Sequence, residues 1–70
     1  MTLPTDVSHD RVIRALERAG FIIREGAKHS VGRKDRFRVS IPRHRRIRLS
    51  TLARIVRQAG ITLEEFRELL

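Results

Sequence analysis

The sequence predicts an α+β domain in which helices pack on one face of a three-stranded antiparallel sheet. Apolar residues recur with helical spacing near the start of the chain and again after residue 50, and between these segments they alternate with polar residues. A meander of strands covered on one face by helices is the simplest way to bury these apolar stripes together. The predicted order is α-β-β-β-α with one further short helix, and residues 1–70 form a single domain.

The first predicted helix follows a short lead-in over residues 1–7. Ser8 or Asp6 can cap its start, and Gly20 is placed to end it. Its apolar residues follow helical spacing and are Val12, Ile13, Leu16 and Ala19. His9 lies in the first turn, where we expect a surface side chain.

Two short strands are predicted next. Residues 21–23 form a run rich in β-branched residues between two glycines, and residues 29–32 form a second strand after a turn at Gly26. Residues 33–35 are expected to make the hairpin turn. By alternation His29 shares a face with Val31, which we expect to be the core side unless a turn or bulge redirects His29.

Strict alternation predicts the third strand most clearly. Phe37, Val39 and Ile41 fall on one face, while Arg36, Arg38 and Ser40 fall on the other. This pattern is typical of a half-buried strand with a basic outer face. Pro42 ends the strand.

Two helices are predicted to complete the chain. Ser50 is expected to cap a helix that Gly60 closes, and its apolar residues repeat at helical spacing (Leu52, Ile55, Val56, Ala59). Thr62 and Glu65 match a capping box, which starts the last short helix.

Positive charge is concentrated in one stretch of the chain. Residues 33–48 contain eight Lys or Arg against one Asp, which gives +7 of the formal net charge of +8. Fourteen of the sixteen basic residues are arginine, whose planar fork suits bidentate contacts to phosphate. The pattern favours a nucleic-acid partner bound through phosphates. The three aromatic residues lie on apolar stripes, so base-stacking platforms are not apparent.

Other classes of protein are disfavoured. No apolar run is long enough to span a bilayer, and the first residues lack the charged start and apolar middle of a signal peptide. We therefore expect a cytoplasmic protein without a membrane partner. Cysteine is absent, no metal-ligand spacing is found, and there is no phosphate-binding glycine loop or dinucleotide fingerprint. No metal and no small-molecule cofactor are expected.

The turn from Gly26 to His29 is the candidate reactive site. Histidine titrates near neutral pH and can act as a general base or acid, and the glycine lets a substrate backbone approach. From residue type and spacing alone, a structural role for His29 at the start of a strand is favoured over a catalytic one, because one histidine near one glycine is a weak signal.

The chain resembles the HicA toxins, the mRNA interferases of bacterial and archaeal toxin–antitoxin pairs. The resemblance spans residues 12–70 and includes the helix end over residues 16–21 and the Gly-x-x-His turn over residues 26–29. It continues with Ser-Ile-Pro-Arg-His at residues 40–44 and with residues 51–55 and 57–61. Many members have histidine two residues after the glycine, where this chain has Lys28.

The resemblance implies a fold like that of double-stranded-RNA-binding domains and a metal-independent endoribonuclease silenced by a HicB-type antitoxin. It implies that His29 is the catalytic residue, acting as general base on a ribose 2′-OH of mRNA. The expected phosphate-binding residues are Lys28, Arg33, Lys34, Arg43, His44, Arg45 and Arg46. Two alternatives stay open: a non-catalytic RNA- or DNA-binding module of the same fold, and a protein-interaction module whose basic face meets an acidic partner.

Overall fold

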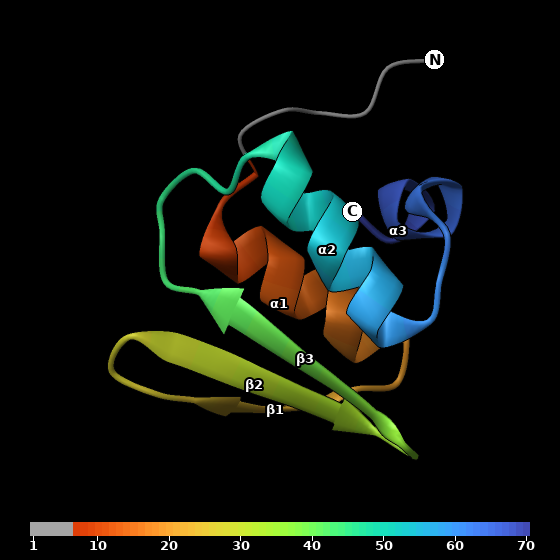
Figure 1. Ribbon diagram of the computed structural model, residues 1–70, viewed down its shortest axis with the longest axis horizontal. Helices are drawn as coiled ribbons and strands as arrows, with labels where there is room; N and C mark the ends of the chain where they lie inside the picture. The colour runs from red at the N-terminus through yellow and green to blue at the C-terminus, as the bar shows by residue number, and fades with distance from the viewer. Residues whose placement is uncertain (1–6) are drawn as a thin grey trace.

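The computed structural model of the chain describes residues 7–70 and contains one sheet and three helices (Figure 1). The alternative cap Asp6 lies outside the described residues. The elements are α1 (His9–Arg18), β1 (Ile22–Glu25), β2 (His29–Lys34), β3 (Phe37–Pro42), α2 (Leu49–Ala59) and α3 (Leu63–Leu69). The predicted order of helix, three strands and two helices is confirmed.

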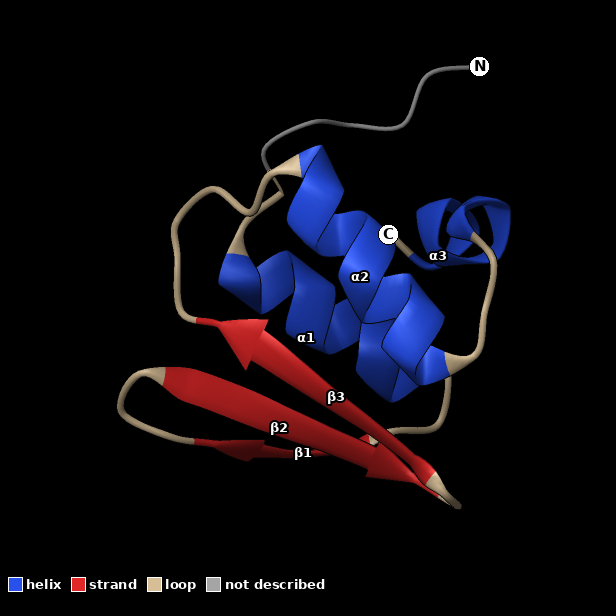
Figure 2. Cartoon of the chain, in the orientation of Figure 1, coloured by secondary structure: helices blue, strands red, loops and turns tan. Residues whose placement is uncertain are grey.

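The three strands form an antiparallel sheet in the order β1-β2-β3, and the helices lie on one of its faces (Figure 2). Helix α1 packs against β1 and β3, α2 packs against β3, and α3 contacts both other helices. Among residues 7–70, no helix or strand packs on the opposite face of the sheet, which we call the open face. The fold is therefore the predicted two-layer α+β arrangement.

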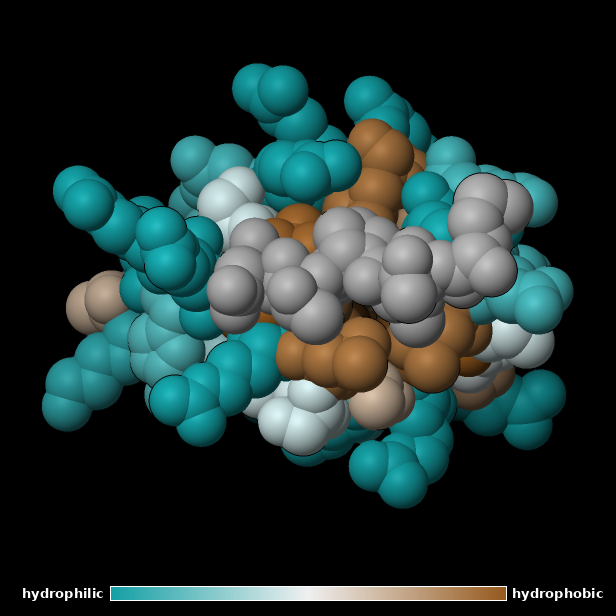
Figure 3. Space-filling model, turned by 90° about the horizontal axis from the view of Figure 1, so that it is seen from above, coloured by the Kyte–Doolittle hydropathy of each residue, from teal (hydrophilic) through white to brown (hydrophobic). Residues whose placement is uncertain are grey.

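The core lies between the helices and the sheet. Leu16 of α1, Ile41 of β3, Ile55 of α2 and Phe66 of α3 are all essentially fully buried. Each such side chain contributes roughly 1.5–3 kcal/mol by leaving water. Seen from the helix side, hydrophobic side chains gather near the middle of the molecule and hydrophilic ones surround them (Figure 3).

The facing of β3 agrees with the alternation, but that of β2 is opposite to the prediction. Ser30 and Gly32 are buried toward the helices, whereas Val31 lies on the open face. The reason is space: a Cβ on Gly32 would lie 2.9 Å from Ile23 Cδ1. Small residues are needed on the core side of β2. The prediction is wrong because it places the apolar Val31 on the core side.

The hairpin between β2 and β3 is shorter than predicted. Lys34 and Phe37 are paired, so the turn consists of Asp35 and Arg36 rather than residues 33–35. Asp35 has a φ of 53°, a left-handed conformation that aspartate tolerates. Arg33 and Lys34 therefore belong to β2.

Two of the three predicted N-terminal helix caps are correct. The hydroxyl of Ser8 accepts a hydrogen bond from the Arg11 amide, and Thr62 and Glu65 form both bonds of a capping box. The predicted cap at Ser50 is wrong. Helix α2 begins at Leu49 after the buried Ile47, and its N-cap is Arg48, whose side chain makes no capping bond.

These caps predict unequal costs for two similar substitutions. Thr62→Ala should lower the free energy of unfolding by about 1 kcal/mol, because it removes the acceptor for the Glu65 amide. Ser50→Ala should change it by less than about 0.5 kcal/mol, because Ser50 is an exposed residue in the first turn of α2. Denaturant unfolding of both variants measures the difference, and equal costs would contradict this assignment of the caps.

Candidate nucleic-acid interface

The basic site, formed by the turn over residues 26–29 and the loop over residues 43–48, lies at one end of the sheet, where three segments meet. Because the strands are antiparallel, the end of β1, the start of β2 and the end of β3 come together there. His29 pairs with Pro42, and the Arg43 amide donates a hydrogen bond of 3.2 Å to the Lys28 carbonyl. The loop over residues 43–48 leaves β3 at this point, directly beside the Gly26–His29 turn.

Backbone hydrogen bonds from the start of the chain hold this loop in place. Val7 and Ile47 form a bridge with bonds of 3.3 and 2.8 Å between their backbones, and the His9 amide donates to the His44 carbonyl over 3.2 Å. Both Val7 and Ile47 are buried. The side chains of residues 43–46 therefore project from a backbone that is fixed at both ends.

Most of the predicted site residues gather at this end. The side chains of Lys28 and His29 are exposed, as are those of residues 43–46 in the neighbouring loop. Gly26 permits the tight turn before them, because a Cβ there would lie 2.5 Å from the His29 carbonyl oxygen. His29 shares the face of Val31 as predicted, but this is the open face of the sheet, so the expectation that it points toward the core is wrong.

Arg43 has an internal partner. Its Nη1 donates to Glu25 Oε1 over 2.8 Å, and both side chains are partly exposed. This ion pair connects the end of β3 with the end of β1 across the start of β2. The Glu25 carboxylate partly neutralises the Arg43 guanidinium. Among residues 7–70, Arg45 and Arg46 have no such ion pair, so their charges are more available to a ligand.

Arg33 and Lys34 do not join this group. Lys34 lies five residues along β2 from His29, roughly 17 Å away at 3.4 Å per residue. Its Nζ donates a 2.6 Å hydrogen bond to the Ala19 carbonyl at the end of α1. Arg33 lies on the open face of the sheet. Lys34 therefore closes the end of a helix, and Arg33 belongs to a separate part of the surface.

His9 is another residue whose predicted position is wrong. It is 6% exposed instead of lying at the surface. Its Nε2 lies 2.8 Å from Ser30 Oγ, and its Nδ1 lies 3.1 Å from Asp10 Oδ1. The carboxylate can only accept, so Nδ1 donates to Asp10, and in the neutral ring Nε2 accepts from the Ser30 hydroxyl. The partner is 21 residues away, and no local spacing could have indicated it.

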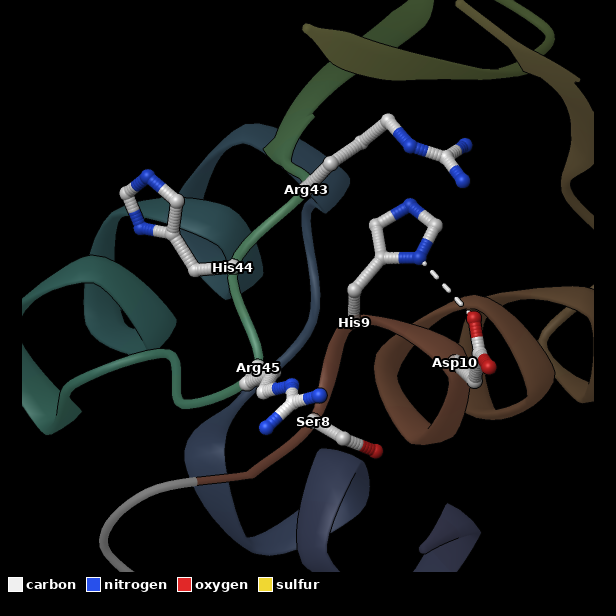
Figure 4. Close-up of a pocket in the computed structure, with 6 residues that line it drawn as sticks. All are labelled: Ser8, His9, Asp10, Arg43, His44 and Arg45. Carbon is white, nitrogen blue, oxygen red and sulfur yellow. Dashed lines mark hydrogen bonds and ion pairs between the residues drawn. The ribbon is translucent and has the colours of Figure 1, made fainter. Parts of the chain in front are cut away.

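A small pocket of about 240 Å³ adjoins this histidine (Figure 4). His44 lines the pocket, although its ring is turned away from that of His9 (Figure 4). The other lining residues are Ser8, His9, Asp10, Arg43 and Arg45. His9 thus forms the buried floor beneath the start of the basic loop.

The contacts from Asp10 through His9 to Ser30 follow the order of a serine-hydrolase triad, but they cannot perform that chemistry. Ser30 has no exposed surface, so no substrate can reach its hydroxyl. The arrangement joins α1 to β2 at the residue after His29. It is a structural hydrogen-bond chain that fixes the strand beside the site.

Within residues 7–70, no group of three or more His, Cys, Asp and Glu side chains is arranged to hold a metal ion. Every helix in this range is too short or too polar to cross a bilayer. Among residues 26–29 and 43–46, the exposed groups that can take part in chemistry are two imidazoles, one ammonium and three guanidiniums (His29, His44, Lys28, Arg43, Arg45, Arg46).

Fold and site together define a small basic α+β protein with an exposed histidine and a fixed cationic loop at one end of its sheet. Residues 10–61 match the family model described as the HicA toxin of bacterial toxin–antitoxin systems. The match covers well over half of the chain. The chain therefore belongs to the HicA toxin family, and the resemblance noted from its sequence is confirmed. Membership implies a toxin role and an antitoxin partner. Neither the curated proteins nor the solved structures include a significant match.

Proposed function

We propose that this toxin is a metal-independent endoribonuclease that cleaves mRNA in the cytoplasm, with His29 as its general base. The observation that supports this most directly is the position of His29. Its exposed side chain stands at the start of β2, next to a loop whose backbone is fixed and whose cations face solvent. Lys28, His44, Arg45 and Arg46 supply the phosphate contacts.

The reaction is an internal transfer at one phosphodiester bond. Neutral His29 takes the proton from a ribose 2′-OH, and the 2′ oxygen attacks the adjacent phosphorus. The bond from phosphorus to the 5′ oxygen of the next nucleotide breaks, leaving a 2′,3′-cyclic phosphate. Lys28 and the loop arginines stabilise the negative charge that grows on the phosphoryl oxygens. The leaving 5′ oxygen takes its proton from water, Lys28 or His44.

The same position suggests how the toxin is silenced. In this proposal, a HicB-type antitoxin covers His29 and the loop over residues 43–46. The site is exposed and strongly cationic, so a partner with acidic side chains can both occlude it and replace the phosphates.

A non-catalytic RNA- or DNA-binding module is the second candidate, and one observation favours it. Among residues 7–70, no hydrogen bond orients the ring of His29. A general base is usually positioned by a further group. In this alternative the basic loop binds phosphates and His29 has no chemical role.

The test compares unmodified RNA with 2′-O-methyl RNA of the same sequence, in the presence of EDTA. We expect the wild-type protein to cleave only the unmodified strand, because methylation removes the attacking hydroxyl. The products should end in a 2′,3′-cyclic phosphate and a 5′-hydroxyl, which mass spectrometry identifies. Cleavage of the methylated strand would exclude this mechanism. Binding of both strands without cleavage would favour the non-catalytic module, and absence of binding would favour a protein-interaction role.

A further inference from the structure

The open face of the sheet carries three arginines around two apolar side chains. Arg24 of β1, Arg33 of β2 and Arg38 of β3 surround Ile22 and Val31, and these five residues line a hollow of about 480 Å³. Ile22 is 80% exposed. The hollow is distinct from the pocket beside His9, with which it shares no lining residue.

The arginines are placed so that their charges repel one another. Arg33 and Arg38 are direct cross-strand partners, an arrangement that destabilises a sheet when both charges have the same sign. No Asp or Glu of the three strands alternates onto this face. Within residues 7–70, none of the three guanidiniums has a hydrogen bond or ion pair. An anion bound between them would remove this repulsion.

His29 lies on the same face of the same strand as Arg33. Residues 29, 31 and 33 of β2 all point to the open side, and His29 is separated from Arg33 by about 14 Å at 3.4 Å per residue. A nucleic-acid strand of a few nucleotides spans that distance. A strand held at His29 can therefore place a second phosphate group between Arg33 and Arg38.

We infer that Arg24, Arg33 and Arg38 form a second phosphate-binding site for single-stranded RNA, a few nucleotides from the bond at His29. The inference builds on the proposed function and adds Arg24 and Arg38 to the interface. The face is three strands wide, roughly 10 Å between the outer strands, which suits one nucleic-acid strand better than a duplex. Ile22 and Val31 contact the base or ribose next to the bound phosphate.

The experiment measures binding of a fluorescent 2′-O-methyl uridine 12-mer, which the proposed reaction cannot cleave, by anisotropy over a range of salt concentrations. The double variant Arg33→Ala/Arg38→Ala should bind at least tenfold more weakly at low salt. Its slope of log affinity against log salt should decrease by about 0.7 for each phosphate that the variant no longer neutralises. The matched control is Arg14→Ala/Arg57→Ala, which removes the same charge from exposed positions on α1 and α2. Its slope should remain close to that of the wild type.

Equal slopes for the two double variants would overturn the proposal. A variant that loses binding to poly-L-glutamate but keeps RNA binding would also overturn it, since the face would then be a site for an acidic protein. A different outcome would contradict the nuclease proposal alone. If the wild type binds the methylated 12-mer through these arginines but leaves unmodified RNA intact, the phosphate site stands and the catalytic role of His29 does not.

Discussion

Replacement of His29 by alanine is expected to reduce RNA cleavage by about 100- to 10,000-fold, the usual contribution of a general base. The side chain is exposed and makes no hydrogen bond within residues 7–70, so its removal should leave the fold unchanged. Phosphate binding by the neighbouring loop should also be unaffected. Cleavage rates, RNA affinity and thermal unfolding of the purified variant measure the three quantities.

A swap of two neighbouring residues provides a matched control for His29→Ala. The variant Lys28→His/His29→Lys keeps composition and charge but moves the imidazole into the turn before β2. We expect it to be as inactive as the alanine variant, because position 29 alone stands at the start of the open face. Full cleavage by the alanine variant would rule out His29 as the base. Cleavage by the swap variant alone would show that an imidazole at position 28, where many HicA toxins have histidine, can also serve. Weak RNA binding by the alanine variant would instead assign His29 to binding.

Replacement of His9 by leucine is expected to lower the free energy of unfolding by about 1–3 kcal/mol. The substitution leaves the hydroxyl of the fully buried Ser30 without its partner, and an unsatisfied buried polar group has a cost of this size. The core of a domain of this length rarely supplies more than about 3–5 kcal/mol of stability, so the decrease is a large fraction of the total. Denaturant unfolding measures it.

A double-mutant cycle separates the effect of the hydrogen bond from changes in packing. Ser30→Ala in the His9→Leu background removes the unsatisfied hydroxyl and should recover part of the stability. The two single substitutions should therefore cost more in sum than the double variant. Strict additivity would show that the bond between His9 and Ser30 contributes nothing. Because Ser30 follows His29, we also expect the His9→Leu variant to cleave RNA more slowly at temperatures where it remains folded.

Local patterns were sufficient to predict much of the fold. The alternation from Arg36 to Ile41 correctly assigned the buried face of β3, and the capping box at Thr62 and Glu65 correctly placed the start of α3. The clustering of the Gly26 turn with the loop over residues 43–46 follows from the antiparallel order of the strands. In each case the signal lies within a few residues of the feature that it determines.

The errors concern features that depend on distant contacts. Val31 indicated the core side of β2, but space beneath the strand is limited by Ile23, so Gly32 faces inward instead. The local pattern places His9 at the surface, because its partner Ser30 lies on another element and leaves no sign near His9 in the sequence. The residue type of Ser50 predicts a cap there, but α2 already begins at Leu49, shortly after the bridge between Val7 and Ile47.

The hydrogen bonds from Val7 and His9 to the loop over residues 43–48 have a consequence for folding, because the site is complete only after they form. The hairpin of β2 and β3 joins residues close in sequence, but the loop over residues 43–48 is fixed by contacts that close about forty residues of chain. Such long-range contacts are costly in loop-closure entropy and are expected to form after local ones. A chain that has formed only its sheet would lack the ordered loop, so the site is complete only when both parts of the domain have docked.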